Sequence, residues 1–325
     1  MKRILTLACA ALAAATIVPA FALLSGPAAA ADLVKLAIGQ RGNWDTAVPH
    51  LGEKAGIFKK HGIDLELTYT SGSGETLQPV ISNSVDVGLA VGTFGAFSAY
   101  AKGAPVRIIG AEATGAADYW YAKTESGIKT LKDADGKTIA FSSNGSSTNS
   151  VVLAFIKEFG LKSKPMATGN PAATLTAVMT NQVDVGWAAP PFGLKEIDEG
   201  KIVLVARATD ASIVKGQTIR TIVTNTETLA KRKDVLVRFM DAYRETIDYM
   251  YSANPQVIKD YAEFNKIPEA MAKRVRDEFF PKAMINPDAF KGLDTLMPEA
   301  VALKFIPEPL KKEQISELIQ VPLKK

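Results

Sequence analysis

Short apolar runs alternate along the chain with longer segments in which apolar residues return at helical spacing. The runs at residues 34–38 and 85–91 fit buried strands, whereas segments such as 46–61 and 151–159 fit amphipathic helices. Strands that alternate with helices of this length predict parallel sheets covered by helices on both faces. The pattern therefore indicates an α/β protein.

The pattern also repeats once. Residues 76–95 recur at 174–193 without a gap, so that Val85-Asp86-Val87-Gly88 returns as Val183-Asp184-Val185-Gly186. This period is much longer than that of solenoid repeats and predicts two copies of one small domain. We expect a first lobe at residues 32–118, a second lobe at 119–220, and a return to the first lobe with C-terminal helices at 221–325. The connections near 114–118 and 216–220 would be the hinge. Asp86 and Asp184 fall one in each copy and are expected to brace a strand start.

The C-terminal third differs in kind from the two repeats. Residues 226–252 predict one long helix with Leu236, Met240, Tyr243 and Ile247 on a single stripe, and prolines then separate shorter helices. These large side chains are expected to pack one lobe and not to contact a ligand.

The first 31 residues have the order of a secretory signal peptide. Lys2 and Arg3 precede a long apolar stretch that ends in small residues, with cleavage expected after Ala31. The alternatives are a transmembrane anchor, which the prolines of this segment oppose, and a lipoprotein processed before Cys9, for which the preceding apolar stretch is too short. We therefore expect a mature protein exported to the periplasm.

Composition excludes several classes of function. Without Lys2 and Arg3 the mature chain has 36 basic and 34 acidic residues, a near balance that argues against nucleic-acid binding. It has no cysteine, and its two histidines, His50 and His61, are too far apart on a helix to share a metal ion. No catalytic or phosphate-binding motif is present. We expect no catalytic residue, no metal and no cofactor.

Polar loops follow several predicted strands, at the sheet edge where α/β proteins bind ligands. Two facing lobes would bring these loops to one cleft. The candidate ligand-binding residues in them are Gln40, Asn43, Trp44, Ser71, Gly72, Ser73, Thr93, Phe94, Asn144, Ser146, Ser147, Thr148 and Pro190.

The run of hydroxyl and amide residues at 142–150 is the strongest candidate. It opens a helix, where free backbone N–H groups and a partial positive charge favour an anionic group. Helix capping is the alternative, although one or two such residues are enough for a cap. Trp44 could stack on a ligand or lie in the core, and Trp120 is equally ambiguous. Arg41 could pair with an acid group or lie free on the surface.

Several segments resemble solute-binding proteins of the nitrate, sulfonate and taurine type, a group that includes binding proteins for thiamine-type pyrimidines. The resemblance lies in Gly-Ile-Phe-Lys-Lys-His-Gly-Ile-Asp-Leu-Glu-Leu at residues 56–67, and in residues 85–88, 131–137 and 145–148. It implies a type II periplasmic binding fold, in which two α/β lobes close on a solute, and docking to a permease. It also implies that residues 146–148 hold the acid group of the ligand.

These observations together predict a periplasmic substrate-binding component of an ABC importer. It would act as a monomer with a permease and its ATPase in the inner membrane, capturing a small sulfonate- or carboxylate-like solute by lobe closure. A neutral heterocycle stays open as the ligand. The alternatives are a sensor accessory protein that presents its ligand to a receptor, and an enzyme related to pyrimidine synthesis, which the absence of cysteine opposes.

Overall fold

The computed structural model describes residues 30–324. The predicted signal peptide and Cys9 lie, apart from Ala30 and Ala31, outside the described residues.

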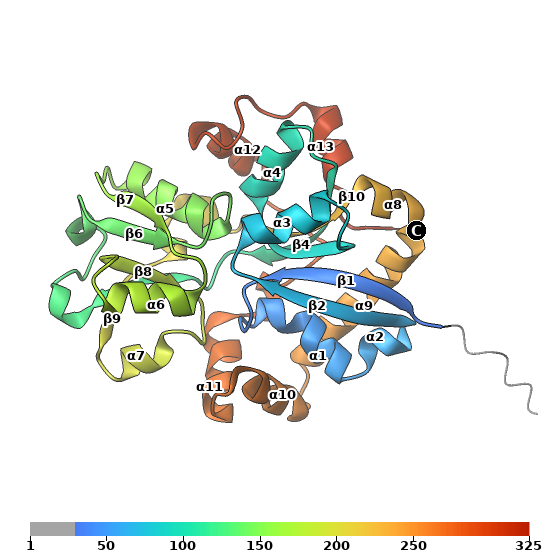
Figure 1. The fold of residues 1–325 in the computed structure, drawn as a ribbon, viewed down its shortest axis with the longest axis horizontal. Helices are drawn as coiled ribbons and strands as arrows, with labels where there is room; N and C mark the ends of the chain where they lie inside the picture. Colours follow the sequence, from blue (N-terminus) through green and yellow to red (C-terminus); the bar gives the residue numbers. More distant parts are fainter. Residues whose placement is uncertain (1–29, 325) are drawn as a thin grey trace, which may run out of the picture. The chain divides into compact units, whose positions relative to one another are not determined.

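The chain builds two five-stranded sheets, each the centre of one lobe (Figure 1). In spatial order the first sheet contains β2 (Ile63–Thr70), β1 (Asp32–Gly39), β3 (Val87–Gly92), β10 (Thr218–Asn225) and β4 (Val106–Thr114). The second contains β7 (Lys164–Ala167), β6 (Thr138–Phe141), β8 (Val185–Ala188), β5 (Tyr119–Lys123) and β9 (Ile202–Arg207). Two α/β lobes of corresponding strand order confirm the predicted fold class.

Neither sheet is purely parallel, which corrects the sequence prediction. β10 pairs antiparallel with β3 and β4, and β5 pairs antiparallel with β8 and β9. The reason is that β5 and β10 are the strands by which the chain enters a lobe from the other one, so no crossover helix precedes them. β4 leads into β5 through residues 115–118, and β9 leads back to β10 through 208–217. The lobe boundaries at 118 and 220 stay predictions.

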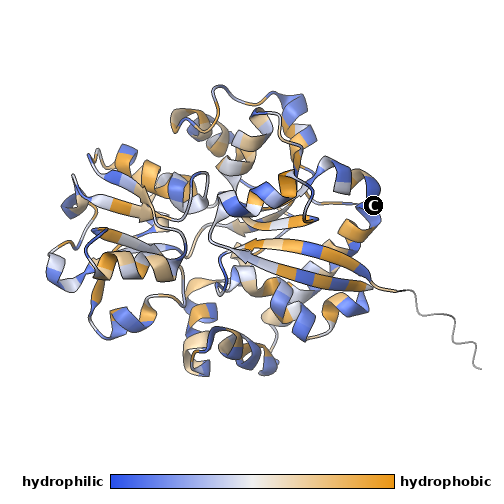
Figure 2. Cartoon of the chain, in the orientation of Figure 1, coloured by the Kyte–Doolittle hydropathy of each residue, from blue (hydrophilic) through white to orange (hydrophobic). Residues whose placement is uncertain are grey.

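Helices cover the faces of both sheets, with apolar residues on the strands and hydrophilic residues on outer helix surfaces (Figure 2). In the first lobe they are α1 (Val48–Lys54), α2 (Ile57–Lys60), α3 (Ser73–Ile81) and α4 (Thr93–Ala101). In the second they are α5 (Ser147–Glu158), α6 (Pro171–Met179) and α7 (Leu194–Asp198). Single 3₁₀ turns lie at Asp45–Ala47, Thr124–Ser126, Lys132–Ala134, Ala208–Asp210 and Ser212–Val214. The helix predicted over 46–61 is interrupted because Gly56 takes the left-handed conformation, with φ of 74°.

The sequence repeat is a structural repeat. α3 and α6 begin and end at equivalent positions, and each packs on the following strand, β3 or β8. The side chain of Asp86 accepts a hydrogen bond from the backbone N–H of Lys35 at 2.9 Å, and that of Asp184 accepts one from Thr138 at 2.8 Å. Both aspartates therefore brace a neighbouring strand, as the repeat predicted.

The C-terminal region packs mainly on the first lobe. It consists of α8 (Thr226–Lys231), α9 (Lys233–Met250), α10 (Gln256–Asn265), α11 (Glu269–Arg274), a π turn (Val275–Phe279), a 3₁₀ turn (Lys282–Met284), α12 (Leu293–Ala302) and α13 (Lys312–Leu318). α9 contacts α1, α2 and β2 through its buried stripe. The single helix predicted over 226–252 is wrong, because Arg232 leaves the helical conformation while its guanidinium pairs with Asp86 at 2.5 Å. Within residues 30–324 no helix combines the length and apolar character needed to cross a bilayer.

Candidate functional site

A small cavity of about 20 Å³ lies where the two sheets direct their strand ends toward each other. Its lining comes from loops of the first lobe, from the start of α5 in the second lobe, and from β8 and β10. The lining residues are Gly39, Gln40, Asn43, Gly72, Ser73, Ala90, Ser142, Ser146, Ser147, Thr148, Trp187 and Arg220. A volume of this size accommodates about one water molecule. A larger solute therefore requires the lobes to move apart.

The lobes meet through backbone as well as side chains. A Cβ atom added at Gly92 would lie 2.5 Å from the carbonyl oxygen of Gly145, and one added at Gly95 would lie equally close to it. The backbone N–H of Gly74, in the first turn of α3, donates to Ser143 Oγ at 3.2 Å. Glycine at positions 92 and 95 allows the first lobe to approach the loop before α5 to within van der Waals contact.

The start of α5 is capped and buried. Ser146 is the N-cap, and its Oγ accepts a hydrogen bond from the backbone N–H of Asn149 at 3.1 Å. Thr148 Oγ1 lies 3.0 Å from both Ser142 Oγ and Ser146 Oγ. Capping thus explains Ser146, but it does not explain Ser147, whose hydroxyl turns to the opposite lobe. Among the described residues no hydrogen-bond acceptor is recorded for the backbone N–H groups of Ser147 and Thr148, which belong to the first helical turn.

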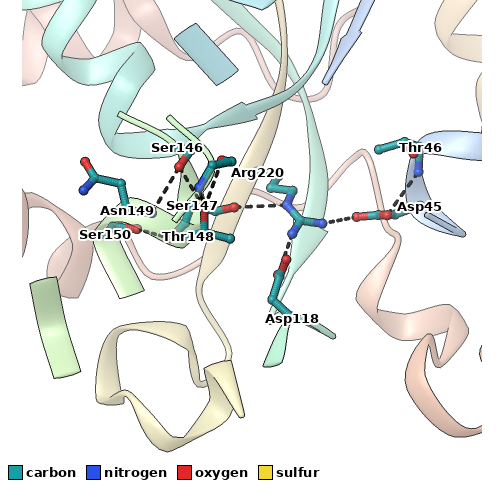
Figure 3. A network of polar contacts seen from close by, with 10 residues as sticks. Asp45, Thr46, Asp118, Ser146, Ser147, Thr148, Asn149, Ser150 and Arg220 are labelled. Atoms are coloured by element: carbon teal, nitrogen blue, oxygen red, sulfur yellow. Dashed lines mark hydrogen bonds and ion pairs between the residues drawn. The ribbon is translucent and has the colours of Figure 1, made fainter. Parts of the chain in front are cut away.

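Arg220 of β10 is the centre of a buried ionic network (Figure 3). Its Nη1 donates to Asp45 Oδ2 and its Nη2 to Asp118 Oδ2, each at 2.5 Å, and its Nε donates to Ser147 Oγ at 3.1 Å. Asp45 follows β1, Asp118 lies in the β4–β5 connection and Ser147 opens α5. A single guanidinium thus joins the first lobe, a crossover segment and the second lobe.

Burial and the charge of the ion-pair partner act in opposite directions on the pKa values of Arg220 and Asp118, whereas burial and the charge of Asp45 act in the same direction on the pKa of Glu112. Burial disfavours the charged form of Arg220, but the attraction of Asp118 and Asp45 outweighs it and raises the pKa of Arg220. Burial raises the pKa of Asp118, against the attraction of Arg220. Burial and the charge of Asp45 raise the pKa of Glu112 well above its ordinary value. Glu112 lies on β4, fully buried, and one of its oxygens accepts from the backbone N–H of Ala90.

Four buried polar atoms of the cavity lining have no hydrogen-bond partner among the described residues. They are Gln40 Oε1, Asn43 Oδ1, Asn43 Nδ2 and Trp187 Nε1. The amide of Gln40 is oriented by its Nε2, which donates to the carbonyl of Ser71 at 2.6 Å. Buried polar groups in proteins are normally paired, so four unpaired atoms at one cavity indicate a place where a ligand makes hydrogen bonds.

Seven of the thirteen residues expected from the sequence line the cavity. They are Gln40, Asn43, Gly72, Ser73, Ser146, Ser147 and Thr148. Two more lie beside it without lining it. The carbonyl of Ser71 accepts from Gln40. Asn144 lines a larger groove of about 910 Å³ between α3, α4, α5 and the loop after α12. Four buried polar atoms without a partner belong to residues that line the small cavity, and none of those found among the described residues belongs to the lining of the groove, so we place the site at the small cavity.

The other four expected residues do not line the cavity and are buried within the protein. Trp44 is fully buried, packs against Tyr261 with ring centroids 4.7 Å apart, and donates from Nε1 to Tyr251 Oη at 3.1 Å. Phe94 packs in the core against Phe97 and Phe305. Thr93 Oγ1 donates to the carbonyl of Thr218 at 2.7 Å, and Pro190 is buried beyond the end of β8.

Arg41 and Trp120, whose roles the sequence left open, also lie away from the cavity. The Arg41 guanidinium stacks 3.9 Å from the ring centroid of Phe264 and donates to its carbonyl. Trp120 lies within the second sheet and donates from Nε1 to the carbonyl of Ala140 at 2.8 Å. Both side chains are therefore satisfied by the protein itself.

Sequence reasoning missed Arg220, Trp187, Asp45 and Asp118. One signal for Arg220 was available, because it is the only charged residue in Thr218–Asn225, a strand in which every residue is buried. Within residues 30–324 no group of three histidine, cysteine, aspartate or glutamate side chains is arranged to hold a metal ion.

Comparison with known proteins agrees with the fold. The chain is similar in fold to the alkanesulfonate-binding protein SsuA from Xanthomonas axonopodis, with a TM-score of 0.73, 17% identity, and 88% of this chain and 97% of that chain covered. It is also similar to the periplasmic nitrate-binding protein NrtA from Synechocystis, with a TM-score of 0.72, 12% identity, and 89% and 86% covered. A third similar structure is the ligand-binding component of an ABC-type import system from Staphylococcus aureus, with a TM-score of 0.70, 13% identity, and 90% and 97% covered.

A search of curated protein sequences gave no match. The sequence model described as "NMT1/THI5 like" matches residues 45–257, which is more than half of the chain. The match spans both lobes and the network around Arg220. The chain therefore belongs to the NMT1/THI5-like family.

Proposed function

We propose that this protein is the solute-binding component of an ABC-type importer and that it captures a small polar solute between its lobes. The observation that carries the proposal is the small interlobe cavity, whose lining residues hold four buried polar atoms without a partner among the described residues. The fold shared with sulfonate-binding and nitrate-binding proteins and with an ABC import component supports the same role. Export to the periplasm and delivery to a permease and its ATPase are parts of this proposal.

Lobe closure is the mechanism that fits the geometry. The cavity is smaller than any organic solute, and its lining is divided between the lobes, so a solute enters an open form and completes the lining on closure. A solute that bridges the lobes stabilises the closed form, and a permease that recognises only this form receives loaded protein.

The start of α5 is the proposed position for the acceptor-bearing end of the solute. The backbone N–H groups of Ser147 and Thr148 and the partial positive charge of the helix favour an electron-rich group there. From the sequence we proposed a sulfonate or carboxylate for this end. The geometry supports an acid group or another strong acceptor at this position.

Native mass spectrometry of residues 32–325 tests the proposal. The protein, purified gently from cells and then denatured, is expected to release a small molecule of defined mass. Small-angle scattering of ligand-stripped protein is expected to show compaction when that molecule is added back. A chain that neither carries nor binds any small molecule would contradict solute capture.

A matched pair of variants locates the site. Ser146 and Asn170 both cap helices of the second lobe, Ser146 by accepting from Asn149 at 3.1 Å and Asn170 by accepting from Ala173 at 2.9 Å. Each alanine substitution removes one cap and lowers stability by about 1 kcal/mol. Only Ser146→Ala is expected to weaken ligand retention, because only Ser146 lines the cavity. Equal retention by the two variants would exclude the start of α5 from the site.

A further inference from the structure

The cavity lining offers unpaired acceptors as well as unpaired donors. Gln40 Oε1 is an acceptor whose orientation is set by the hydrogen bond from Nε2 to Ser71. The amide of Asn43 presents one donor and one acceptor in either of its two orientations, since both atoms lack a partner among the described residues. Trp187 Nε1 is a donor. A fully deprotonated oxyanion has only acceptors, so it would pair with the donors and leave Gln40 Oε1 and the Asn43 acceptor buried and unpaired.

The charge of the site also disfavours an anionic solute. Among the described residues Arg220 is the only charged side chain that lines the cavity, and its charge is already matched by Asp45 and Asp118 at 2.5 Å each. Asp45 and Asp118 are themselves 0% and 2% exposed, so solvent does not screen them. Glu112 adds no positive charge in either protonation state. Even if one of these carboxylates is protonated, no excess positive charge is left at Arg220 to balance an incoming anion.

We propose, on the basis of the solute-capture function above, that this cavity selects solutes that are neutral overall, either uncharged or zwitterionic, and that carry at least one N–H donor. The donor of the solute pairs with Gln40 Oε1 and the Asn43 carbonyl. Its acceptor end faces the first turn of α5 and Trp187 Nε1. Simple oxyanions and organic acids without a donor group are discriminated against.

Two matched pairs of probes separate charge and donor capacity from size. Taurine and ethanesulfonate share a sulfonate and a two-carbon chain, but taurine is a zwitterion with N–H donors, whereas ethanesulfonate is an anion without any hydrogen-bond donor. Propionamide and propionate differ in that only the amide is neutral and has N–H donors. Nitrate serves as the simple oxyanion. Ligand-stripped protein is exposed to each pair at equal concentration, and to the small-molecule extract of its host cells, and retained molecules are identified by native mass spectrometry.

We expect the neutral member of a pair to be retained at least about tenfold more strongly than its anionic partner. We also expect the solute retained from the extract to have no net charge at pH 7. Retention of an anionic member as strongly as its neutral partner, or of a net anion from the extract, would overturn the inference while leaving solute capture intact. Retention of nothing from either source would overturn the proposed function itself, and the inference with it.

Substitution of the carboxylates supplies a second readout. Asp45→Asn and Asp118→Asn each remove one negative charge beside Arg220, so either variant is expected to shift the ratio of neutral to anionic retention toward the anion by about tenfold or more. Asp260→Asn is the control, because Asp260 is also buried and paired, with Lys54 at 3.1 Å, but does not line the cavity or contact Arg220. The use of two variants covers the case in which one fails to fold. A ratio that is unchanged in the folded variants would overturn the role of the charge balance.

Discussion

Arg220 on β10 donates from Nε to the Oγ of Ser147 at the start of α5, a hydrogen bond of 3.1 Å that ties the first lobe to the second. The same guanidinium holds Asp45 and Asp118 through its two other nitrogens. The network therefore contributes both to the contact between the lobes and to the stability of the first lobe, and substitutions can separate these contributions.

Replacement of Arg220 by Met is expected to destabilise the fold strongly. The change leaves Asp45 and Asp118 buried without a cation, which costs about 3–5 kcal/mol. Urea unfolding at pH 7 measures this loss in the free energy of unfolding. Lys231→Met is the control, because Lys231 pairs with Glu227 on an exposed helix surface, where solvent screens the ion pair and its contribution to stability is small. Equal losses in the two variants would show that the buried network is not a major source of stability.

Gly95→Ala is expected to weaken the proposed closure of the lobes without weakening the fold. Gly95 lies within α4, where alanine favours the helix by about 1 kcal/mol, but its new Cβ would lie 2.5 Å from the carbonyl oxygen of Gly145 in the other lobe. The variant should therefore fold well, bind ligand more weakly and show less compaction by small-angle scattering.

Gly74→Ala is the matched control for this experiment. Gly74 is also in a helix that faces the other lobe, but the nearest atom to its added Cβ would be 3.7 Å away, an ordinary contact. It is expected to bind ligand as the unmodified protein does. Weakened binding by Gly74→Ala and not by Gly95→Ala would contradict the closure geometry.

Of two tryptophan substitutions, one is expected to lower the stability of the fold and the other to lower ligand affinity. Trp44→Phe removes the hydrogen bond to Tyr251 and part of the core, so it should lower stability by about 1–3 kcal/mol and leave ligand affinity close to its original value. Trp187→Phe removes an indole N–H that has no partner among the described residues and lines the cavity, so ligand affinity should fall about tenfold. Unfolding curves and titration calorimetry measure the two quantities. A loss of affinity confined to Trp44→Phe would reverse these assignments.

The stability of the protein is expected to fall as the pH rises above about 4.5, and Glu112→Gln should reduce this fall. Burial and Asp45 raise the pKa of Glu112 well above the ordinary value of 4.5. At a pH between 4.5 and the pKa of Glu112 in the folded state, the folded protein binds more protons than the unfolded protein. The contribution of protonated Glu112 to the free energy of unfolding is therefore complete below pH 4.5 and is lost as the pH rises through the pKa of the folded state. The slope per group is at most about 1.4 kcal/mol per pH unit.

Unfolding of Glu112→Gln between pH 4 and 9 checks this expectation. Asp118, whose pKa burial also raises, contributes a dependence of the same sign that remains in the variant. A variant with the full pH dependence of the unmodified protein would show that Glu112 does not titrate in the folded state.

The fold could be predicted from the sequence to a large extent because its signals are local. The hydrophobic period and the repeat placed α3 and α6 at equivalent positions, and the loops after the first strands gave Gln40, Asn43 and Ser146 to the cavity. Arg220 could not be placed, since its position depends on a strand that returns from the second lobe and pairs antiparallel between β3 and β4. Trp44 was ambiguous, because only tertiary packing shows that its indole N–H is paired with Tyr251.

The ion pair between Arg220 and Asp118 limits how the two lobes can travel. Asp118 lies in the connection that leaves the first lobe, and Arg220 lies near the start of the strand that returns to it, so the pair fastens both connections side by side at 2.5 Å. A rotation about this point keeps the two groups together, whereas a sliding displacement would pull a buried cation from its partner. In the proposed opening and closing of the lobes, this pair would therefore act as a single pivot, and each cycle would return the same two surfaces to the same alignment.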